Sequence, residues 1–391
     1  MRRAVVALLL FCAGLARAAD FPFESLHPAG AVPKSNRINV LFVSDGYTRE
    51  ELDGYRERVR ELVRALLEER PYKEYANFFT FTRIDNAPPD GPVTGTTLST
   101  GEDVDLEVNK VWSANPALPR HVVVMLVNGW RPGSFCYGRN IVLSEVNDLP
   151  GLVSLLSHEL GHALGQLYDE DSVDGPGPAA PLPPEEELSA NITRESDASR
   201  VKWKSWIESK ILGNPVAGGM GRSSGLYRPK ETCRMKYASA APFCEVCVEE
   251  HIRRFYTNVS LLEPWTPADE IVRAGGAGQP VTVAVSCVAP TPATSVIGEW
   301  SLDGRMLEGK GTRSEGPQGP RFEIVLEGAQ MTPGTHDLKF VVTDKTTLVK
   351  DAKEDDPIYR RRPNIRKWAV KVPASLTQLP VLRRVATSLA E

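Results

Sequence analysis

Residues 149–171 have the sequence LPGLVSLLSHELGHALGQLYDED, and this stretch is the most informative about the fold. Its leucine, valine and alanine side chains recur at helical spacing over a wide arc, which favours a buried helix. Pro150 suits the first turn of such a helix, and Gly165 can end it through a left-handed turn. The sequence therefore predicts a buried helix from about Pro150 to Gly165.

Two histidines on this predicted helix have the spacing of metal ligands. His158 and His162 are four residues apart, so they share a face. Zinc binds imidazole nitrogens at about 2.0–2.1 Å, and this spacing supplies two of them. Glu159 lies beside the metal, where a carboxylate can take a proton from water and pass it to a leaving amine. We interpret the pattern as a catalytic zinc site, because the alternative, two core histidines beside an incidental glutamate, would bury an unpaired charge.

The motif continues beyond the second histidine. The pattern H-E-x-x-H-x-x-G resembles the opening of the metzincin metalloproteases, which take a third ligand at the tenth position after the first histidine. That position is Tyr168 here, and Asp169 follows it. Because aspartate binds zinc well and tyrosine does not, the sequence favours Asp169 as the third ligand. Glu170 and Asp171 remain alternatives, and the acidic run could also be a solvated loop.

Metzincins also place a methionine beneath the metal, as an apolar floor under the imidazoles. Met235 is the candidate for this position, and Met220 is a weaker one in a glycine-rich stretch. Tyr237 lies two residues after Met235. In some metzincins a tyrosine at that offset approaches the zinc and stabilises the tetrahedral intermediate. The resemblance therefore implies a catalytic role for Tyr237.

Apolar runs alternate with helical patterns ahead of the motif, which indicates an α/β layered domain. Four such runs are predicted as strands: 38–44, 78–84, 122–127 and 140–144. After Pro264 the composition shifts to short segments of period-two alternation. The sequence thus predicts a metallopeptidase domain at 19–266 and an all-β sandwich of immunoglobulin-like type at 267–373. A loosely held tail is expected at 374–391.

The first 18 residues have the features of a secretory signal peptide. Arg2 and Arg3 precede an apolar run that is too short to span a bilayer, and Ala16-Arg17-Ala18 supplies a small-residue cleavage site. We therefore expect cleavage after Ala18 and a secreted or periplasmic protein. The formal net charge of −4 gives no indication of a nucleic-acid footprint, and no later segment is predicted to span a membrane.

Removal of residues 1–18 leaves five cysteines. Cys233 and the pair Cys244 and Cys247 are close together in the sequence. In an exported protein this spacing favours a disulfide over a second zinc site. We expect a bridge from Cys233 to one member of the pair.

Several further blocks resemble the M64 peptidases, which are often called IgA peptidases. These blocks are N-V-L-F-V-S-D-G-Y-T at 39–48, V-N-G-W at 127–130, the pattern from His158 to Glu170, A-N-I-T at 190–193, Y-R-P at 227–229, and the cysteine-rich stretch from Cys233 to Cys247. The resemblance covers roughly residues 36–255. It implies a metzincin-like fold and a zinc endopeptidase, and its motif places the aspartate ligand on Asp169. The tyrosine often found after D-E in the family is replaced by Asp171.

The leading hypothesis is a secreted endopeptidase that acts on a protein or peptide substrate. We expect the substrate to bind extended along an edge strand near 135–143, with contacts to Tyr137 and Val142. An adhesion or binding protein that keeps zinc structurally is an alternative, as is a zinc hydrolase of glycans or small amides. Glu159 favours catalysis over the structural role, because a structural zinc site has no use for a general base.

Overall fold

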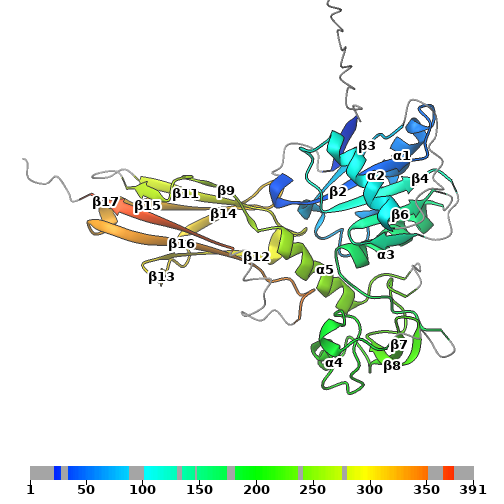
Figure 1. Cartoon of the computed structure of the whole chain (residues 1–391). Helices are drawn as coiled ribbons and strands as arrows, with labels where there is room; N and C mark the ends of the chain where they lie inside the picture. The colour runs from blue at the N-terminus through cyan, green and yellow to red at the C-terminus, as the bar shows by residue number, and fades with distance from the viewer. Residues whose placement is uncertain are drawn as a thin grey trace, which may run out of the picture.

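The computed structural model describes residues 22–27, 34–87, 101–129, 134–145, 148–173, 181–236, 241–274, 280–350 and 364–373 (Figure 1). An α/β part is followed by a β part that extends away from it, and α5 lies between the two (Figure 1). The predicted signal peptide at 1–18 and the predicted tail at 374–391 lie outside the described residues.

A six-stranded sheet forms the centre of the α/β part. Four of its strands run parallel to one another: β2 (Ile38–Asp45), β3 (Phe79–Ile84), β4 (Val122–Val127) and β6 (Asn140–Ser144). The edge strands β1 (Phe23–His27) and β5 (Phe135–Tyr137) pair antiparallel, which gives the order β1-β3-β2-β4-β6-β5. The parallel strands are buried almost throughout, so each reads as a continuous apolar run. All four predicted strands are confirmed.

Helices cover both faces of this sheet, as the α/β prediction requires. Helices α1 (Leu52–Leu66) and α3 (Leu149–Ala163) pack on the face that carries Val40 and Phe42. Helix α2 (Gly101–Ala114) packs on the opposite face, against Leu41 and Val43. Successive strand residues point to opposite faces, so one apolar strand can fill two cores. Helix α3 confirms the helix that was predicted from about Pro150 to Gly165.

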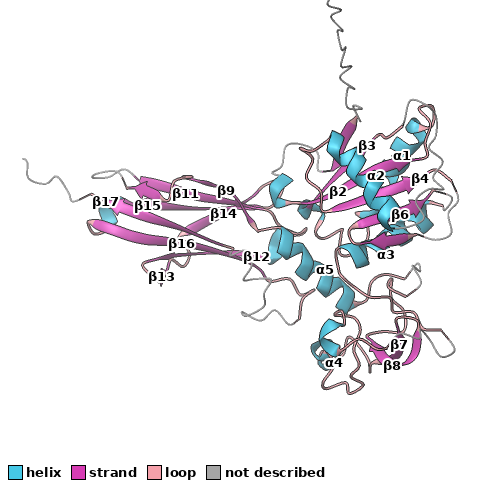
Figure 2. Ribbon diagram, in the orientation of Figure 1, coloured by secondary structure: helices cyan, strands magenta, loops and turns pink. Residues whose placement is uncertain are grey.

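The chain after α3 folds into short elements, which Figure 2 shows by type. They are the 3-10 helix η3 (Glu185–Glu187), the helix α4 (Lys204–Glu208), the hairpin strands β7 (Val216–Gly219) and β8 (Arg222–Arg228), and the longer helix α5 (Glu245–Asn258). Two further 3-10 helices, η1 (Lys34–Asn36) and η2 (Ala76–Phe78), precede β2 and β3. Helix α5 then leads directly into the β part.

The β part contains two sheets, and its two 3-10 helices are η4 (Ala293–Ser295) and η5 (Gly328–Gln330). The first sheet has the order β10-β17-β16-β12-β13, with bounds Ile271–Arg273, Ile365–Val372, Gly334–Asp344, Val296–Leu302 and Arg305–Met306. The second has the order β14-β15-β11-β9, with bounds Gly311–Glu315, Pro320–Glu327, Pro280–Cys287 and Leu262–Thr266.

Aromatic side chains fill the space between these two sheets. Phe322 of β15 contacts Phe340 of β16 across the gap, with ring centroids 5.4 Å apart, and Trp300 packs on Phe340. The predicted all-β packing therefore holds for this part of the chain. All of its strand pairs are antiparallel except β10 with β17, which is parallel. Strand β9 at Leu262–Thr266 lies ahead of the predicted boundary at 267, because its sequence LEPWT lacks a period-two pattern.

Buried polar contacts join the two parts. Arg37, next to β2, pairs with Glu263 of β9 at 2.5 Å, and both side chains are almost fully buried. The backbone nitrogen of Thr291 donates to the carbonyl oxygen of Glu74 at 2.6 Å. Separating the two parts would leave each buried charge without its partner, which is costly. These contacts therefore hold the β part against the α/β part. No helix in the described ranges has the length and apolar character needed to cross a membrane.

Candidate metal centre and active site

Helix α3 places the motif residues at the edge of the core. Its N-terminus is capped by Asp148, whose side chain accepts a hydrogen bond from the backbone nitrogen of Gly151 at 2.8 Å. Leu152, Leu156 and Leu160 are buried on the face that packs against α1 and the sheet. The motif side chains are therefore carried by a rigid element.

Three side-chain atoms converge beyond this helix. Nε2 of His158 and Nε2 of His162 are 3.2 Å apart, and Oδ1 of Asp169 lies 3.2 Å from the first and 3.3 Å from the second. A tetrahedral ion with bonds of about 2.0–2.1 Å holds its ligand atoms about 3.3–3.4 Å apart. The three donors therefore have the spacing that one zinc ion would require.

Backbone carbonyl groups orient the two imidazoles. Nδ1 of His158 donates to the carbonyl oxygen of Arg234 at 2.9 Å, and Nδ1 of His162 donates to that of Leu167 at 2.8 Å. Since a carbonyl can only accept, each Nδ1 carries the proton and each Nε2 keeps a lone pair in the neutral ring. Both lone pairs then face Asp169. Sequence reasoning missed Arg234 and Leu167, because any residue offers a backbone carbonyl.

Asp169 and the two histidines shift one another's pKa values. Burial by itself would raise the pKa of Asp169, but hydrogen bonds with His158 and His162 outweigh it and hold that pKa well below its ordinary value. Burial likewise opposes the charged form of both imidazoles, yet in that form the protonated Nε2 donates to Asp169, and this hydrogen bond raises the pKa of each ring. The neutral ring instead offers the Nε2 lone pair to a cation. The carboxylate is thus held in the anionic form that can bind a cation.

Glu159 is placed differently from the three donors. Its side chain is buried, and this burial raises its pKa above the ordinary value despite the opposing charges of the two histidines. It lines an open cleft of about 770 Å³ together with His158, His162 and Asp169. A carboxylate whose pKa is raised toward neutrality is suited to accept a proton and return it.

Part of the α/β sequence is similar to a known peptidase family. Residues 27–108 match the family described as IgA Peptidase M64. Over this segment, about a fifth of the chain, the sequence is similar to the M64 peptidases. This match supports a peptidase-family hydrolase and confirms, for these residues, the M64 resemblance predicted from the sequence. The matched segment covers the region from β1 into α2 and ends before α3.

Two solved structures of low sequence identity are similar to this chain. Wild-type OgpA from Akkermansia muciniphila is 11% identical, the match covers 82% of this chain and 93% of that one, and the TM-score is 0.33. Archaemetzincin from Methanopyrus kandleri is 18% identical over 36% of this chain and 81% of that one, with a TM-score of 0.24. A search of curated proteins gives no match.

The loop that brings Asp169 to the histidines differs from the prediction in one detail. The left-handed residue after α3 is Gln166, with a φ of 51°, and not Gly165. Gly165 is instead required by space, because a Cβ there would lie 2.7 Å from the carbonyl oxygen of Gly161. The chain does turn back toward the metal site after α3, as predicted. Gly165 is needed there because the turn packs closely, and not for its backbone conformation.

Of the two candidate methionines, Met235 lies beneath the motif. Its side chain is fully buried, and a Cβ added to Gly161 would overlap its sulfur. Met220 packs instead with Leu188, Ile192 and Tyr168 in a separate small cluster. Tyr237, which was predicted to take part in catalysis, lies outside the described residues.

The predicted edge strand is only partly correct. Strand β5 is the last strand in the sheet order, and Phe135 and Cys136 line the cleft. Tyr137 is about half exposed, as a substrate contact requires. Val142, however, belongs to the inner strand β6 and is buried against α2, so it cannot contact a substrate. The prediction failed here because 135–143 includes two strands of the sheet.

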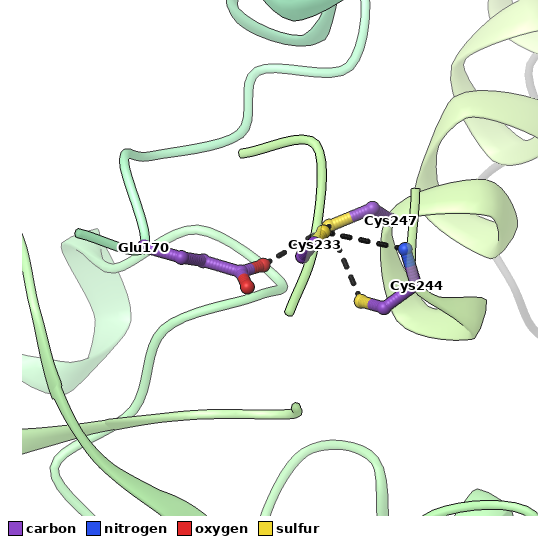
Figure 3. Close-up of side chains that lie close together, drawn as sticks. All are labelled: Glu170, Cys233, Cys244 and Cys247. Atoms are coloured by element: carbon purple, nitrogen blue, oxygen red, sulfur yellow. Dashed lines mark hydrogen bonds between the residues drawn. The ribbon is translucent and has the colours of Figure 1, made fainter. Parts of the chain in front are cut away.

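The predicted disulfide is not formed in this structure. All five cysteines among the described residues are free. Sγ of Cys247 lies 3.7 Å from that of Cys233 and 3.5 Å from that of Cys244, whereas a disulfide bond is about 2.05 Å long. Figure 3 shows the three sulfurs grouped opposite Glu170. The carboxylate beside Asp169 therefore faces the thiols and not the histidines.

Proposed function

We propose that this chain is an exported, M64-type zinc-dependent endopeptidase that hydrolyses peptide bonds at the site formed by His158, His162 and Asp169. The observation that carries the proposal is the spacing of the three donor atoms, 3.2–3.3 Å apart, beside a buried glutamate in an open cleft. The metzincin-like fold, the immunoglobulin-like type of the β part and removal of residues 1–18 belong to the same proposal.

Zinc bound by these three residues would supply Lewis acidity, lowering the pKa of water from about 15.7 toward about 7 and polarising a carbonyl. The protein supplies the remaining steps. The carboxylate of Glu159 accepts the proton of the attacking water and delivers it to the leaving amine. Its raised pKa suits both directions of transfer, because the group can hold the proton between the two steps.

The substrate is proposed to bind along β5, in an extended conformation. An edge strand offers backbone groups that pair with an added strand, so affinity comes from the main chain and preference from the pockets. Tyr137 is exposed on β5, so the Tyr137→Ala variant is expected to raise KM while kcat stays close to that of the wild type. An unchanged KM would argue against this mode of binding.

The function is tested by a single substitution. Glu159→Gln keeps the size of the side chain and removes its ability to take a proton, so kcat should fall by about 10²–10⁴-fold while zinc content stays unchanged. Glu186→Gln is the matched control, because Glu186 is exposed and lines the same cleft. It should cleave an unfolded protein at nearly the wild-type rate.

Two outcomes would contradict the proposal. If Glu159→Gln retains its zinc and cleaves as fast as the wild type, the assigned general base is wrong. If the wild-type protein binds zinc tightly but cleaves no peptide in a broad substrate library, the alternative of a zinc-containing binding protein gains support. A purely structural zinc site would not need a general base such as Glu159, so we prefer the hydrolase over the binding protein.

A further inference from the structure

We propose a second zinc site in this chain, with the ligands Glu170, Cys233, Cys244 and Cys247. Their four ligand atoms lie within 4.8 Å of one another, and all four residues are buried (Figure 3). The site is separate from the His158, His162 and Asp169 group, with which it shares no ligand. Its existence does not depend on the proposed function.

The distances between the sulfurs match a metal site better than a disulfide. A tetrahedral zinc ion with bonds of about 2.3 Å to thiolates holds two sulfurs about 3.8 Å apart. Sγ of Cys247 lies 3.7 Å from Sγ of Cys233 and 3.5 Å from Sγ of Cys244. A single bridge would also leave the third thiol unused, whereas zinc uses all three.

Glu170 completes the set of four. Its side chain is fully buried, and Oε1 lies 3.2 Å from Sγ of Cys247. For a zinc ion with one carboxylate and one thiolate ligand, the two ligand atoms are about 3.5 Å apart. Oε2 of Glu170 is buried and has no hydrogen-bond partner among the described residues. A buried carboxylate without a cation is costly, and a bound metal ion supplies that cation.

Groups around the cluster orient its ligands, as outer-shell groups do in zinc sites. The side-chain nitrogen of Asn191 donates to Oε1 of Glu170 at 2.9 Å. The backbone nitrogen of Cys244 donates to Sγ of Cys233 at 3.2 Å. Cys244 is also the N-cap of the 14-residue helix α5, so the positive end of the helix dipole lies beside the cluster. Three thiolates select zinc over harder cations such as magnesium.

The second ion would also position the first site, an inference that rests on the proposed function. Glu170 follows the ligand Asp169, and its backbone nitrogen donates to the carbonyl oxygen of Met235 at 2.7 Å. Cys233 lies one residue before Arg234, whose carbonyl oxygen orients His158. The second ion would therefore join the loop of the third ligand to the methionine segment and to α5.

The test starts with the metal content of the full chain, prepared with zinc and without reductant. We expect two zinc ions per wild-type chain and one in the variant His158→Ala/His162→Ala, which keeps the cysteine cluster. Cys247→Ser should lose the second ion, whereas Cys287→Ser, the control, should keep both, because Cys287 is buried in β11 of the β part. One zinc ion in the wild type, absent from the histidine variant, would overturn the proposal.

A spectrum distinguishes the two sites even if Cys247→Ser does not fold. With cobalt in place of zinc, thiolate ligands give a charge-transfer band that imidazole and carboxylate ligands do not. The band should appear in the wild type and persist in His158→Ala/His162→Ala, whatever its activity. Its absence from the wild type would overturn the second site and leave the proposed peptidase function untouched.

Alkylation under denaturing conditions gives an independent measurement on the wild type. With a chelator and no reductant, Cys233, Cys244 and Cys247 should all be alkylated, as mass spectrometry of their peptides would show. If a disulfide joins two of them, only the third will react, and the proposal is then wrong. Failure of the peptidase function instead appears as inactivity with both metal signals intact, so the two failures can be told apart.

Discussion

Nδ1 of His158 donates its hydrogen bond to the carbonyl oxygen of Arg234, 76 residues further along the chain, at 2.9 Å. This contact fixes the ring so that Nε2 faces Asp169. The side chain of Arg234 is in turn held by an ion pair with Glu69 at 2.8 Å, just beyond α1. The geometry of the metal site therefore depends on the segment around Met235 as much as on the motif in α3.

The contact between Gly161 and Met235 leads to the first prediction. A Cβ at Gly161 would overlap the sulfur of Met235 and approach Phe243 to 3.3 Å. Gly161→Ala should therefore displace the methionine, lower the free energy of unfolding by about 1–3 kcal/mol and weaken zinc binding. Urea unfolding and a competition assay with a chelating dye would measure the two effects.

Gly54 provides the matched control for this substitution. It also lies within a helix, α1, but a Cβ there would meet no atom within 4 Å. Gly54→Ala should leave zinc affinity unchanged and stabilise the protein by up to about 1 kcal/mol, because alanine favours the helix. Equal effects of the two substitutions would show that Met235 does not support the site.

A second prediction concerns the third ligand. Asp169→Asn removes the carboxylate that faces both imidazoles, so zinc affinity should fall by about 100-fold or more. Asp171→Asn removes the same charge two residues away and should change affinity only a few-fold. Dissociation constants from chelator competition would compare the two variants. If only Asp171→Asn releases zinc, Asp169 is not the ligand.

Much of this arrangement is predictable from the sequence, for physical reasons that are specific to each element. Strands such as β4, VVVMLV, are buried on both faces, and a continuous apolar run leaves little alternative. The spacing of His158 and His162 on an apolar helix brings two imidazoles together whatever the rest of the fold.

Other features depend on contacts between distant segments and leave no local pattern. The carbonyl oxygen of Arg234 that orients His158 belongs to the backbone, so no side chain indicates it. The burial of Val142 follows from the position of β6 inside the sheet, which only the strand order determines. The separation of the cysteine sulfurs likewise depends on how Glu170 and α5 pack together.

A third prediction concerns the junction of the two parts. Oδ2 of Asp344, at the end of β16, accepts hydrogen bonds from the hydroxyl groups of Tyr75 at 2.8 Å and Tyr256 at 2.7 Å. All three residues are buried. Asp344→Ala would remove this acceptor from both hydroxyls, at about 1–3 kcal/mol each, so stability should fall by about 2–6 kcal/mol.

Chemical denaturation would compare the loss of stability in Asp344→Ala with that in Asp337→Ala. Asp337 lies on the same strand, and its exposed side chain should contribute little. If the two variants unfold at the same denaturant concentration, the junction does not depend on Asp344. If only Asp344→Ala unfolds in two steps, the two parts have become uncoupled, which would support the same role.

The last prediction concerns pH and a histidine of the β part. Nδ1 of His336 faces Oδ2 of Asp303 at 2.7 Å, and Nε2 faces the carbonyl oxygen of Thr332 at 2.8 Å. Only the imidazolium can donate to both acceptors, so the bond to Asp303, and then that to Thr332, raises the pKa of His336 above its ordinary 6.5. The folded state thus binds the proton more tightly than the unfolded chain does.

The sign of the pH dependence follows from this difference. The stabilisation from His336 is fully present below pH 6.5 and is lost as the pH rises through the folded-state pKa. Asp303→Asn should bring the NMR titration midpoint of the His336 ring down toward 6.5. Asparagine tolerates the positive φ of 50° at Asp303, so the turn should persist. A midpoint that is the same in both proteins would show that Asp303 does not hold the proton on His336.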